Sequence, residues 1–115
     1  MDSMYENYIK ERENLSVIKT DYGFITYRIE FPNCLIADCF VLPIERQNGH
    51  GSFLTNQVFE ICKGAGVKTV HCQSDENANG HSLSSFAIEN FGFEWISKTG
   101  TINHYKMEVS EWDRV

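Results

Sequence analysis

The chain has 115 residues, of which 42% are hydrophobic and 23% are charged. This composition is ordinary for a single globular domain over residues 1–115, and it excludes a disordered chain. The 16 acidic residues outnumber the 10 lysines and arginines, and the net charge of −6 disfavours nucleic-acid binding, which needs a basic face. No apolar run of about eighteen residues and no signal-peptide pattern occurs, so we expect a cytoplasmic protein without membrane contact.

The four cysteines stand in apolar stretches and lack the paired short spacing of a zinc-binding motif. This pattern favours buried, reduced cysteines in a cytosolic protein. A zinc site formed by Cys72 with His71 and His81 is a weaker alternative, because two of its ligands are adjacent and no second cluster follows. We therefore expect no metal. The cysteines are Cys34, Cys39, Cys62 and Cys72.

Three strands are expected in the first part of the chain, after a short amphipathic helix over the first dozen residues. Alternating apolar residues predict strands over 14–20 and 24–31, joined by a turn at Asp21-Tyr22-Gly23. A second turn leads into residues 34–42, which are almost continuously apolar. Such a run is typical of a central strand that is covered on both faces.

Helices and strands alternate in the rest of the chain. Residues 52–63 place their apolar side chains on one helical face, and Gly64 and Gly66 fit a C-terminal stop. A short strand over 67–72 should run parallel to the strand over 34–42, because a helix lies between them. The remaining expected elements are a polar loop over 73–80, a helix over 81–91, and two antiparallel strands over 93–97 and 102–109.

The segment between the apolar run and the long helix carries the chemistry. It reads Val41-Leu-Pro43-Ile-Glu-Arg46-Gln-Asn-Gly49-His-Gly51. Glycines let successive backbone N–H groups converge on one anion, and the helix N-terminus behind them adds partial positive charge. An arginine can add charge-assisted hydrogen bonds. The segment therefore predicts a pyrophosphate cradle, although it matches neither the nucleoside-triphosphate loop nor the dinucleotide fingerprint.

This segment resembles the coenzyme A loop of the GNAT acetyltransferases, whose signature is Arg/Gln-x-x-Gly-x-Gly/Ala, often preceded by Val-x-Pro. All five signature positions fall in register: Val41, Pro43, Arg46, Gly49 and Gly51. Asp38 before the loop is similar to the acidic strand end of the family's diamine acetyltransferases. The Gly92-Phe93 pair and the element order after residue 14 match as well, so the resemblance covers about a hundred residues.

The resemblance implies an α/β fold with a mixed sheet in the order (α)-β-β-β-α-β-α-β-β and a central parallel strand pair. It also implies acetyl-coenzyme A as co-substrate, with the thioester and pantetheine arm held by the backbone at Val41. Arg46 and the amides of residues 47–52 would bind the pyrophosphate, and Ser52 would also cap the helix. The residues of this amide cradle are Gln47, Asn48, Gly49, His50, Gly51 and Ser52.

By the same resemblance, the protein would transfer acetyl to an amine by direct attack. The acceptor would be a protein lysine or a polyamine-like molecule. A catalytically silent acetyl-coenzyme A binding or protein-interaction module of the same fold is the alternative, and a small α/β interaction protein without cofactor is a further one.

The sequence departs from the family in three places. Ile88 stands where many members have a tyrosine that protonates the leaving thiolate, with Ser84 and Ser85 as candidate substitutes. His81 replaces a common asparagine. The family's first strand and two helices are replaced by some fourteen residues, so the acceptor side should be open. That favours a macromolecular acceptor or a homodimer partner that completes the wall.

Two residues are candidates for handling the acceptor amine. Asp38 is the acid within the apolar run, and burial there should raise its pKa toward a useful value for a base. A structural aspartate bonded to nearby backbone is an equal alternative. His71 is placed at the end of the second parallel strand, where such sheets carry their sites. A surface histidine without a role is the competing interpretation.

Overall fold

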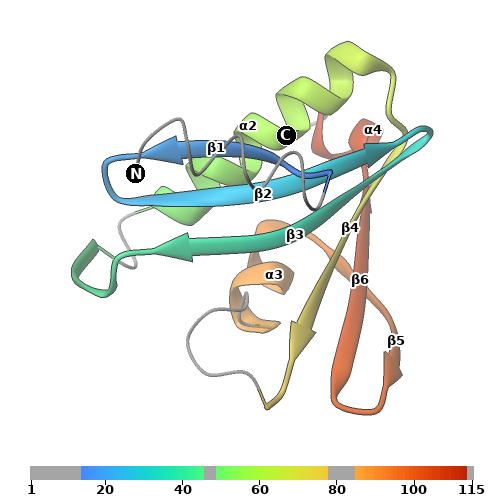
Figure 1. Cartoon of the computed structure of the whole chain (residues 1–115). Helices are drawn as coiled ribbons and strands as arrows, with labels where there is room; N and C mark the ends of the chain where they lie inside the picture. The colour runs from blue at the N-terminus through green and yellow to red at the C-terminus, as the bar shows by residue number, and fades with distance from the viewer. Residues whose placement is uncertain (1–13, 46–48, 78–84, 114–115) are drawn as a thin grey trace.

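The structure is a computed structural model that describes residues 14–45, 49–77 and 85–113. Within these ranges, the chain forms a six-stranded sheet and its helices in the expected alternation (Figure 1). The elements are β1 (Ser16–Thr20), β2 (Gly23–Glu30), β3 (Asn33–Val41), the 3-10 turn η1 (Pro43–Glu45), α2 (His50–Ala65), β4 (Thr69–Asp75), α3 (Ser85–Phe91), β5 (Glu94–Thr99), β6 (Ile102–Glu108) and α4 (Val109–Trp112).

The strand order across the sheet is β1-β2-β3-β4-β6-β5. Neighbouring strands are antiparallel except for β3 and β4, which run parallel in the middle of the sheet. Helix α2 is the crossover between these two strands, as a parallel connection requires. The mixed α/β sheet with a central parallel pair is therefore confirmed. The expected N-terminal helix and residues 81–84 of the expected second helix lie outside the described residues.

Helix α2 forms where apolar side chains recur at helical spacing. Leu54, Val58, Phe59 and Cys62 are fully buried against the sheet. The helix ends at Gly66, whose φ of 77° is left-handed and whose N–H reaches the last carbonyls. The helix begins two residues earlier and ends two residues later than the sequence predicted. None of the described helices is long and apolar enough to cross a membrane.

An aromatic cluster joins the helices to one another. The Phe59 ring of α2 contacts Phe91, Phe93 and Trp112, with centroids 5.4 to 5.8 Å apart. Trp112 belongs to α4, a short helix that the sequence did not predict, and its indole N–H donates to Asn56 at 2.8 Å. Such aromatic contacts add to the hydrophobic stabilisation of the core, so α4 closes the core beside α2.

Strand β4 is longer than the apolar pattern indicates. It runs to Asp75, into the residues expected as a loop, because it pairs with β6 over seven residues. Strand β5 likewise extends to Thr99, which moves the hairpin turn to Gly100 and Thr101. In both cases ladder hydrogen bonds to the neighbouring strand compensate for a polar sequence.

A β-bulge interrupts the pairing of β2 with β3. Thr26 lies opposite Asp38 while the next residue, Tyr27, lies opposite Ile36, so Ala37 has no partner in β2. One extra residue in a strand changes which side chains face the core beyond it. The bulge therefore resets the alternation of β3 halfway along the strand.

The consequence of the bulge is visible in the burial of β3. Cys34 and Ile36 before it and Cys39 after it are buried, whereas Leu35 and Phe40 on the opposite face are half-buried. The expectation that this strand is covered on both faces is therefore wrong. Its continuous apolar run reflects one core face and one partly open face.

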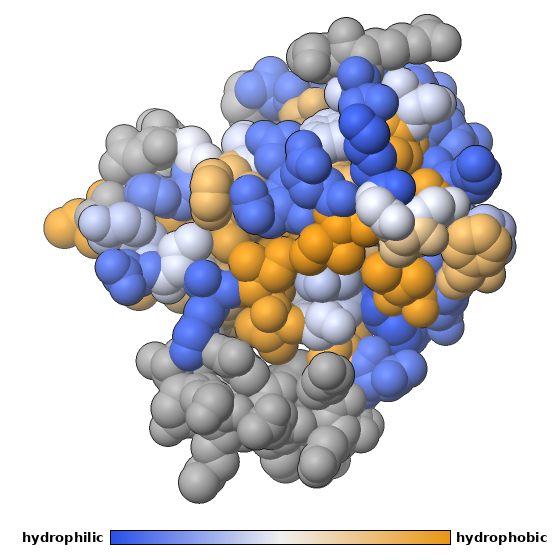
Figure 2. Space-filling view, turned by 90° about the horizontal axis from the view of Figure 1, so that it is seen from above, coloured by the Kyte–Doolittle hydropathy of each residue, from blue (hydrophilic) through white to orange (hydrophobic). Residues whose placement is uncertain are grey.

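Some large apolar side chains stay exposed among the described residues. Figure 2 shows apolar side chains gathered in a band between hydrophilic ones on the face seen from above. The large apolar side chains that stay exposed come from several elements of the fold. The exposed residues are Tyr22, Ile29, Phe31, Leu42, Ile44, Phe53, Ile61, Trp95 and Ile96.

Gly23 offers a direct test of the β2–β3 contact. A Cβ at this position would collide with the carbonyl oxygen of Phe40 on the neighbouring strand. We predict that Gly23→Ala lowers the free energy of unfolding by about 1–3 kcal/mol, as overpacking does. Gly64→Ala is the matched control: its Cβ meets open space inside α2, and it should stabilise by roughly 0.5–1 kcal/mol. Urea unfolding of both variants measures this, and equal effects would contradict it.

Candidate active site

The two central strands separate soon after they meet. β3 and β4 are paired only at Asn33–Thr69, Cys34–Val70 and Leu35–His71. Beyond these pairs, β3 continues along β2 and β4 continues along β6. Figure 1 shows the two strands diverging toward their C-terminal ends. The split leaves backbone groups of β3 and β4 that face each other without a ladder between them.

The C-terminal end of β3 is tied to the β1–β2 turn. The Leu42 N–H donates to the Tyr22 carbonyl at 2.7 Å, and Val41 lies opposite Gly23 in the register. The absence of a side chain at Gly23 lets the two strands approach closely here. The tie fixes the direction in which the chain leaves β3 toward α2.

Helix α2 begins without a side-chain cap. Its N-cap is Gly49, with a left-handed φ of 85°, and its first helical bond runs from the Phe53 N–H to the Gly49 carbonyl at 2.9 Å. Ser52 is an exposed residue of the first turn, so the prediction that it caps the helix is wrong. The amides of Gly51 and Ser52 have no carbonyl partner inside the helix. This end of α2 therefore presents partial positive charge to an anion.

Space for a ligand exists beside the first turn. A Cβ built on Gly51 meets no atom within 4 Å, and the same holds for Gly49. Gly51 has ordinary helical backbone, so its lack of a side chain keeps space open and is not needed for the fold. Of the expected cradle, Arg46, Gln47 and Asn48 lie outside the described residues.

An aromatic contact holds the start of α2 against the β1–β2 turn. The Tyr22 and His50 rings lie 4.5 Å apart between centroids with a tilt of 37°. Sequence reasoning identified the turn but missed this contact, because it joins segments that meet only after the sheet has formed. Tyr22 therefore positions both the end of β3 and the N-terminus of α2.

Asp38 lies on the part of β3 that is no longer paired with β4. It is half-buried, and its Oδ1 accepts a hydrogen bond from the Cys39 N–H at 2.9 Å. The burial expected for this carboxylate is only partial, because the bulge turns it away from the core face. Burial, and to a smaller extent the charge of Asp38, raises the pKa of the Cys39 thiol to about 12. That thiol is not a thiolate nucleophile near neutral pH.

His71 lies near the start of β4, where β3 and β4 are still paired. It is the third residue of the strand and not its last, so the expected position is wrong, because β4 extends further along β6. Its Nε2 lies 3.0 Å from Oδ1 of Asn33. Asp38 is three residues further along β3 than Leu35, the partner of His71. The structure therefore does not bring His71 and Asp38 together.

The structure also tests the expected zinc alternative, the state of the cysteines and the position of Ile88. Cys72 is buried in the core and His71 points to the opposite face, so the two side chains cannot ligate one ion. Burial raises the pKa of the Cys72 thiol to about 12. All four cysteines are free and buried, as predicted. Ile88, at the position of the family's tyrosine, is also buried in the core.

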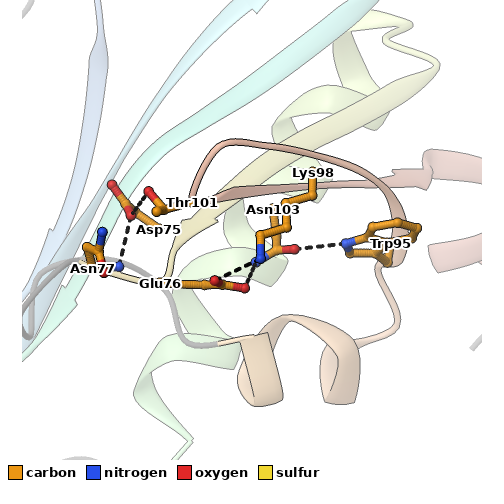
Figure 3. Close-up of polar contacts among 7 residues, drawn as sticks. All are labelled: Asp75, Glu76, Asn77, Trp95, Lys98, Thr101 and Asn103. Atoms are coloured by element: carbon orange, nitrogen blue, oxygen red, sulfur yellow. Dashed lines mark hydrogen bonds and ion pairs between the residues drawn. The ribbon is translucent and has the colours of Figure 1, made fainter.

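The end of β4 is fixed to the β5–β6 hairpin by a polar network (Figure 3). Asp75 Oδ1 accepts from the Asn77 N–H at 2.9 Å and from the Thr101 hydroxyl at 2.8 Å. Glu76 accepts from the Asn103 amide at 3.0 Å and pairs with Lys98 at 2.9 Å. These bonds hold one wall of the split in place.

The sequence matches a known family, and the fold is shared with solved structures. The sequence model of the acetyltransferase (GNAT) family matches residues 2–93. Together with the mixed sheet split at its parallel pair, this match defines the class of protein. The chain belongs to the GNAT family of acetyltransferases. No curated protein matches the sequence.

Solved structures of the same class share the fold. The PaiA N-acetyltransferase of Thermoplasma acidophilum, in complex with coenzyme A, is 15% identical, with a TM-score of 0.69 over 91% of this chain. A Bacillus cereus acetyltransferase is 15% identical (TM-score 0.67, 94% covered), and the ribosomal-protein-S18-alanine N-acetyltransferase of Escherichia coli is 13% identical (0.67, 94%). This chain spans 69%, 94% and 77% of these proteins, and 60–66% of several others.

The polar network makes the free energy of unfolding depend on pH in the acidic range. Hydrogen bonds lower the pKa of Asp75 and of Glu76 from their ordinary values of 3.8 and 4.5. Carboxyls with a lowered folded pKa contribute stability above those ordinary values and lose it as the pH falls through the folded ones. We predict that the free energy of unfolding falls more steeply below about pH 4.5 in the wild type than in Asp75→Asn/Glu76→Gln. Urea unfolding from pH 7 to pH 3 tests this; identical slopes would contradict it.

Proposed function

We propose that the protein is an N-acetyltransferase that moves acetyl from acetyl-coenzyme A to a primary amine. The observation that carries the proposal is the helix N-terminus without a side-chain cap, placed at the open end of a split between two parallel strands. The N-terminus supports binding of a pyrophosphate, and the split supports binding of an extended arm that reaches the backbone of β3. We propose further that residues 1–115 form one such domain.

The residues present fit coenzyme A. The open space beside Gly49 and Gly51 leaves the first-turn amides accessible to a pyrophosphate. In the proposal, the amides of residues 47–52 bind this group with help from Arg46, and the backbone at Val41 holds the pantetheine arm. When bound, acetyl-coenzyme A supplies an activated thioester. The Thermoplasma relative, whose structure contains coenzyme A, supports this assignment.

The proposed reaction is direct attack. The amine nitrogen forms a bond to the thioester carbon, the carbon–sulfur bond breaks, and the thiolate leaves with its electron pair. A primary ammonium loses one proton before the nitrogen attacks and a second as the amide forms, and the amide keeps the third. In the proposal, Asp38, which lies on β3 beyond its pairs with β4, holds the acceptor amine or accepts its proton. Ile88 is buried and has no proton to donate. In the proposal, the thiolate therefore takes a proton from solvent, and it is a fairly stable leaving group without one.

We propose a protein lysine or a polyamine-like molecule as acceptor, and the exposed surface supports the first. Large apolar side chains that stay exposed are available for contact with a macromolecule. One structural relative is named for acetylating an alanine of a ribosomal protein. The net charge of −6 suits a cationic acceptor of either kind.

A catalytically silent acetyl-coenzyme A binding module is the second candidate. The buried Ile88 favours it, because the helix position that often carries a catalytic tyrosine faces the core here. The two candidates share the ligand and differ in turnover. A thiol-release assay with lysine peptides and polyamines therefore separates them.

Ligand binding should stabilise the protein. Because the cradle exists only in the folded state, acetyl-coenzyme A at about a hundred times its Kd should add roughly 2.7 kcal/mol to the free energy of unfolding. A thermal melt measures this as a rise of several degrees. No rise at millimolar coenzyme A would contradict the assignment of the ligand.

A substitution at Gly51 can test coenzyme A binding without disturbing the fold. Because its Cβ direction is open, Gly51→Val should leave the melting temperature nearly unchanged while the branched side chain blocks the pyrophosphate. We predict at least a tenfold loss of coenzyme A affinity, about 1.4 kcal/mol. Gly64→Val, at the other end of α2 and also facing open space, is the control and should bind normally. Calorimetric titration measures the affinity of both variants. Unchanged affinity in Gly51→Val would contradict pyrophosphate binding at the first turn of α2.

A further inference from the structure

We propose that the ring of Phe53 is a stacking platform for the adenine base of coenzyme A. Phe53 lies near the start of α2, the helix whose N-terminus is proposed to bind the pyrophosphate. The inference rests on the proposed function and deepens it, because it assigns a side chain of this protein to a part of the co-substrate that has so far been given no partner. Sequence reasoning placed Phe53 in the helix and gave it no role.

Phe53 is an aromatic side chain that the core does not use. It is 51% exposed, although the next residue of the helix, Leu54, is fully buried. The ring contacts among the described residues do not include Phe53. A phenyl ring left in water forgoes the hydrophobic stabilisation that burial would give. Both faces of this ring are therefore of more use to a flat apolar ligand than to the fold.

The ring is not a single apolar side chain scattered on the surface. Leu42 and the 85% exposed Ile44 lie on the path from β3 into α2, and Tyr22 reaches the helix through its ring contact with His50. With Phe53, they are four of the nine large apolar side chains that stay exposed among the described residues. The segments that carry them lie at one end of the molecule (Figure 1). Exposed apolar side chains thus gather around the start of α2.

Helix geometry directs the Phe53 ring toward the proposed pyrophosphate. The Cα–Cβ bonds of an α-helix tilt toward its N-terminus, so a side chain covers the turn before its own residue. That turn begins at Gly49, whose carbonyl accepts a hydrogen bond from the Phe53 N–H at 2.9 Å. Residues four apart share one helical face, and a Cβ on Gly49 would meet no atom within 4 Å. Open space therefore lies on the N-terminal side of the ring.

Adenosine is the part of coenzyme A that suits this space. A single ribose joins the base to the pyrophosphate, so a pyrophosphate at the first-turn amides keeps the base close to the start of α2. The pantetheine arm leaves the pyrophosphate on its other side, toward β3 in the proposal, and does not compete for the ring. Purine bases stack on aromatic side chains through their π faces. Phe53 can therefore bind the base without a hydrogen bond to its edge.

The first experiment measures the two halves of coenzyme A separately. ADP carries the base and the pyrophosphate without the arm, whereas 4′-phosphopantetheine carries the arm without the base. Calorimetric titration of Phe53→Ala should show an ADP affinity about five- to a hundredfold below that of the wild type, as expected for the loss of a base–aromatic stack. Its 4′-phosphopantetheine affinity should be unchanged. Equal ADP affinity in the variant and the wild type would overturn the stacking site.

Ile61→Ala is the matched control. Ile61 is a second exposed apolar residue of α2, 40% exposed and about two turns further from the N-terminus. This variant should bind ADP like the wild type, because the residue is too far along the helix to reach the base. An ADP affinity that falls equally in Ile61→Ala and Phe53→Ala would contradict a specific contact with Phe53.

The second experiment keeps a flat ring at the position. Phe53→Trp should bind ADP at least as tightly as the wild type, and ADP should quench its fluorescence more than that of the wild type, which contains Trp95 and Trp112. Inorganic pyrophosphate should not cause this quenching. Because Phe53 is exposed, the melting temperatures of its variants should stay close to the wild-type value. A Phe53→Ala protein that melts lower and loses both ADP and 4′-phosphopantetheine would show a structural role and overturn the proposal.

The stacking site and the proposed function fail in different ways. If ADP binding depends on Phe53 but neither 4′-phosphopantetheine nor coenzyme A binds, the base site stands and the acetyltransferase proposal fails. If coenzyme A binds and acetyl transfer to amines is observed, but Phe53→Ala has the wild-type affinity for coenzyme A and for ADP, the transferase proposal stands and the stacking site is wrong.

Discussion

The site depends on a competition for hydrogen-bond partners in the middle of the sheet. β3 follows β2 along its whole length and β4 follows β6, so the two parallel strands share only three residue pairs. Each half of the sheet twists with its own antiparallel neighbours. The split that results leaves unpaired backbone edges inside the fold, which would be a defect in a purely structural sheet. In the function that we propose, this split receives the extended arm of coenzyme A.

Two groups near the site lack hydrogen bonds that would stabilise the fold. The N-terminus of α2 lacks a side-chain cap, and the hydroxyl of Thr26 lacks a hydrogen bond. The ring contact between Tyr22 and His50 and the network around Asp75 hold the surrounding elements in place. Rigid elements that support unsatisfied groups are what a binding site needs, because the ligand then supplies the missing bonds.

Local signals predicted much of this fold. The core face of α2, its stop at Gly66 and the parallel strand pair follow from periodicity and chain order. The bulge at Ala37 does not, because it arises from the pairing of β3 with β2. The prediction that His71 ends its strand was wrong for a similar reason. The apolar run stops before β4 does, because pairing with β6 extends the strand to Asp75. The contact of Tyr22 with α2 joins distant segments and leaves no local pattern.

We propose that the N-terminus of α2 binds the pyrophosphate of coenzyme A at the C-terminal end of the split. A titration of the isotopically labelled protein with coenzyme A, followed by amide NMR, tests it residue by residue. Binding there should give the largest shifts in the amides of Gly49 to Ser52 and of Val41, with little change in the β5–β6 hairpin. Saturating coenzyme A that leaves the first-turn amides of α2 unmoved would contradict it.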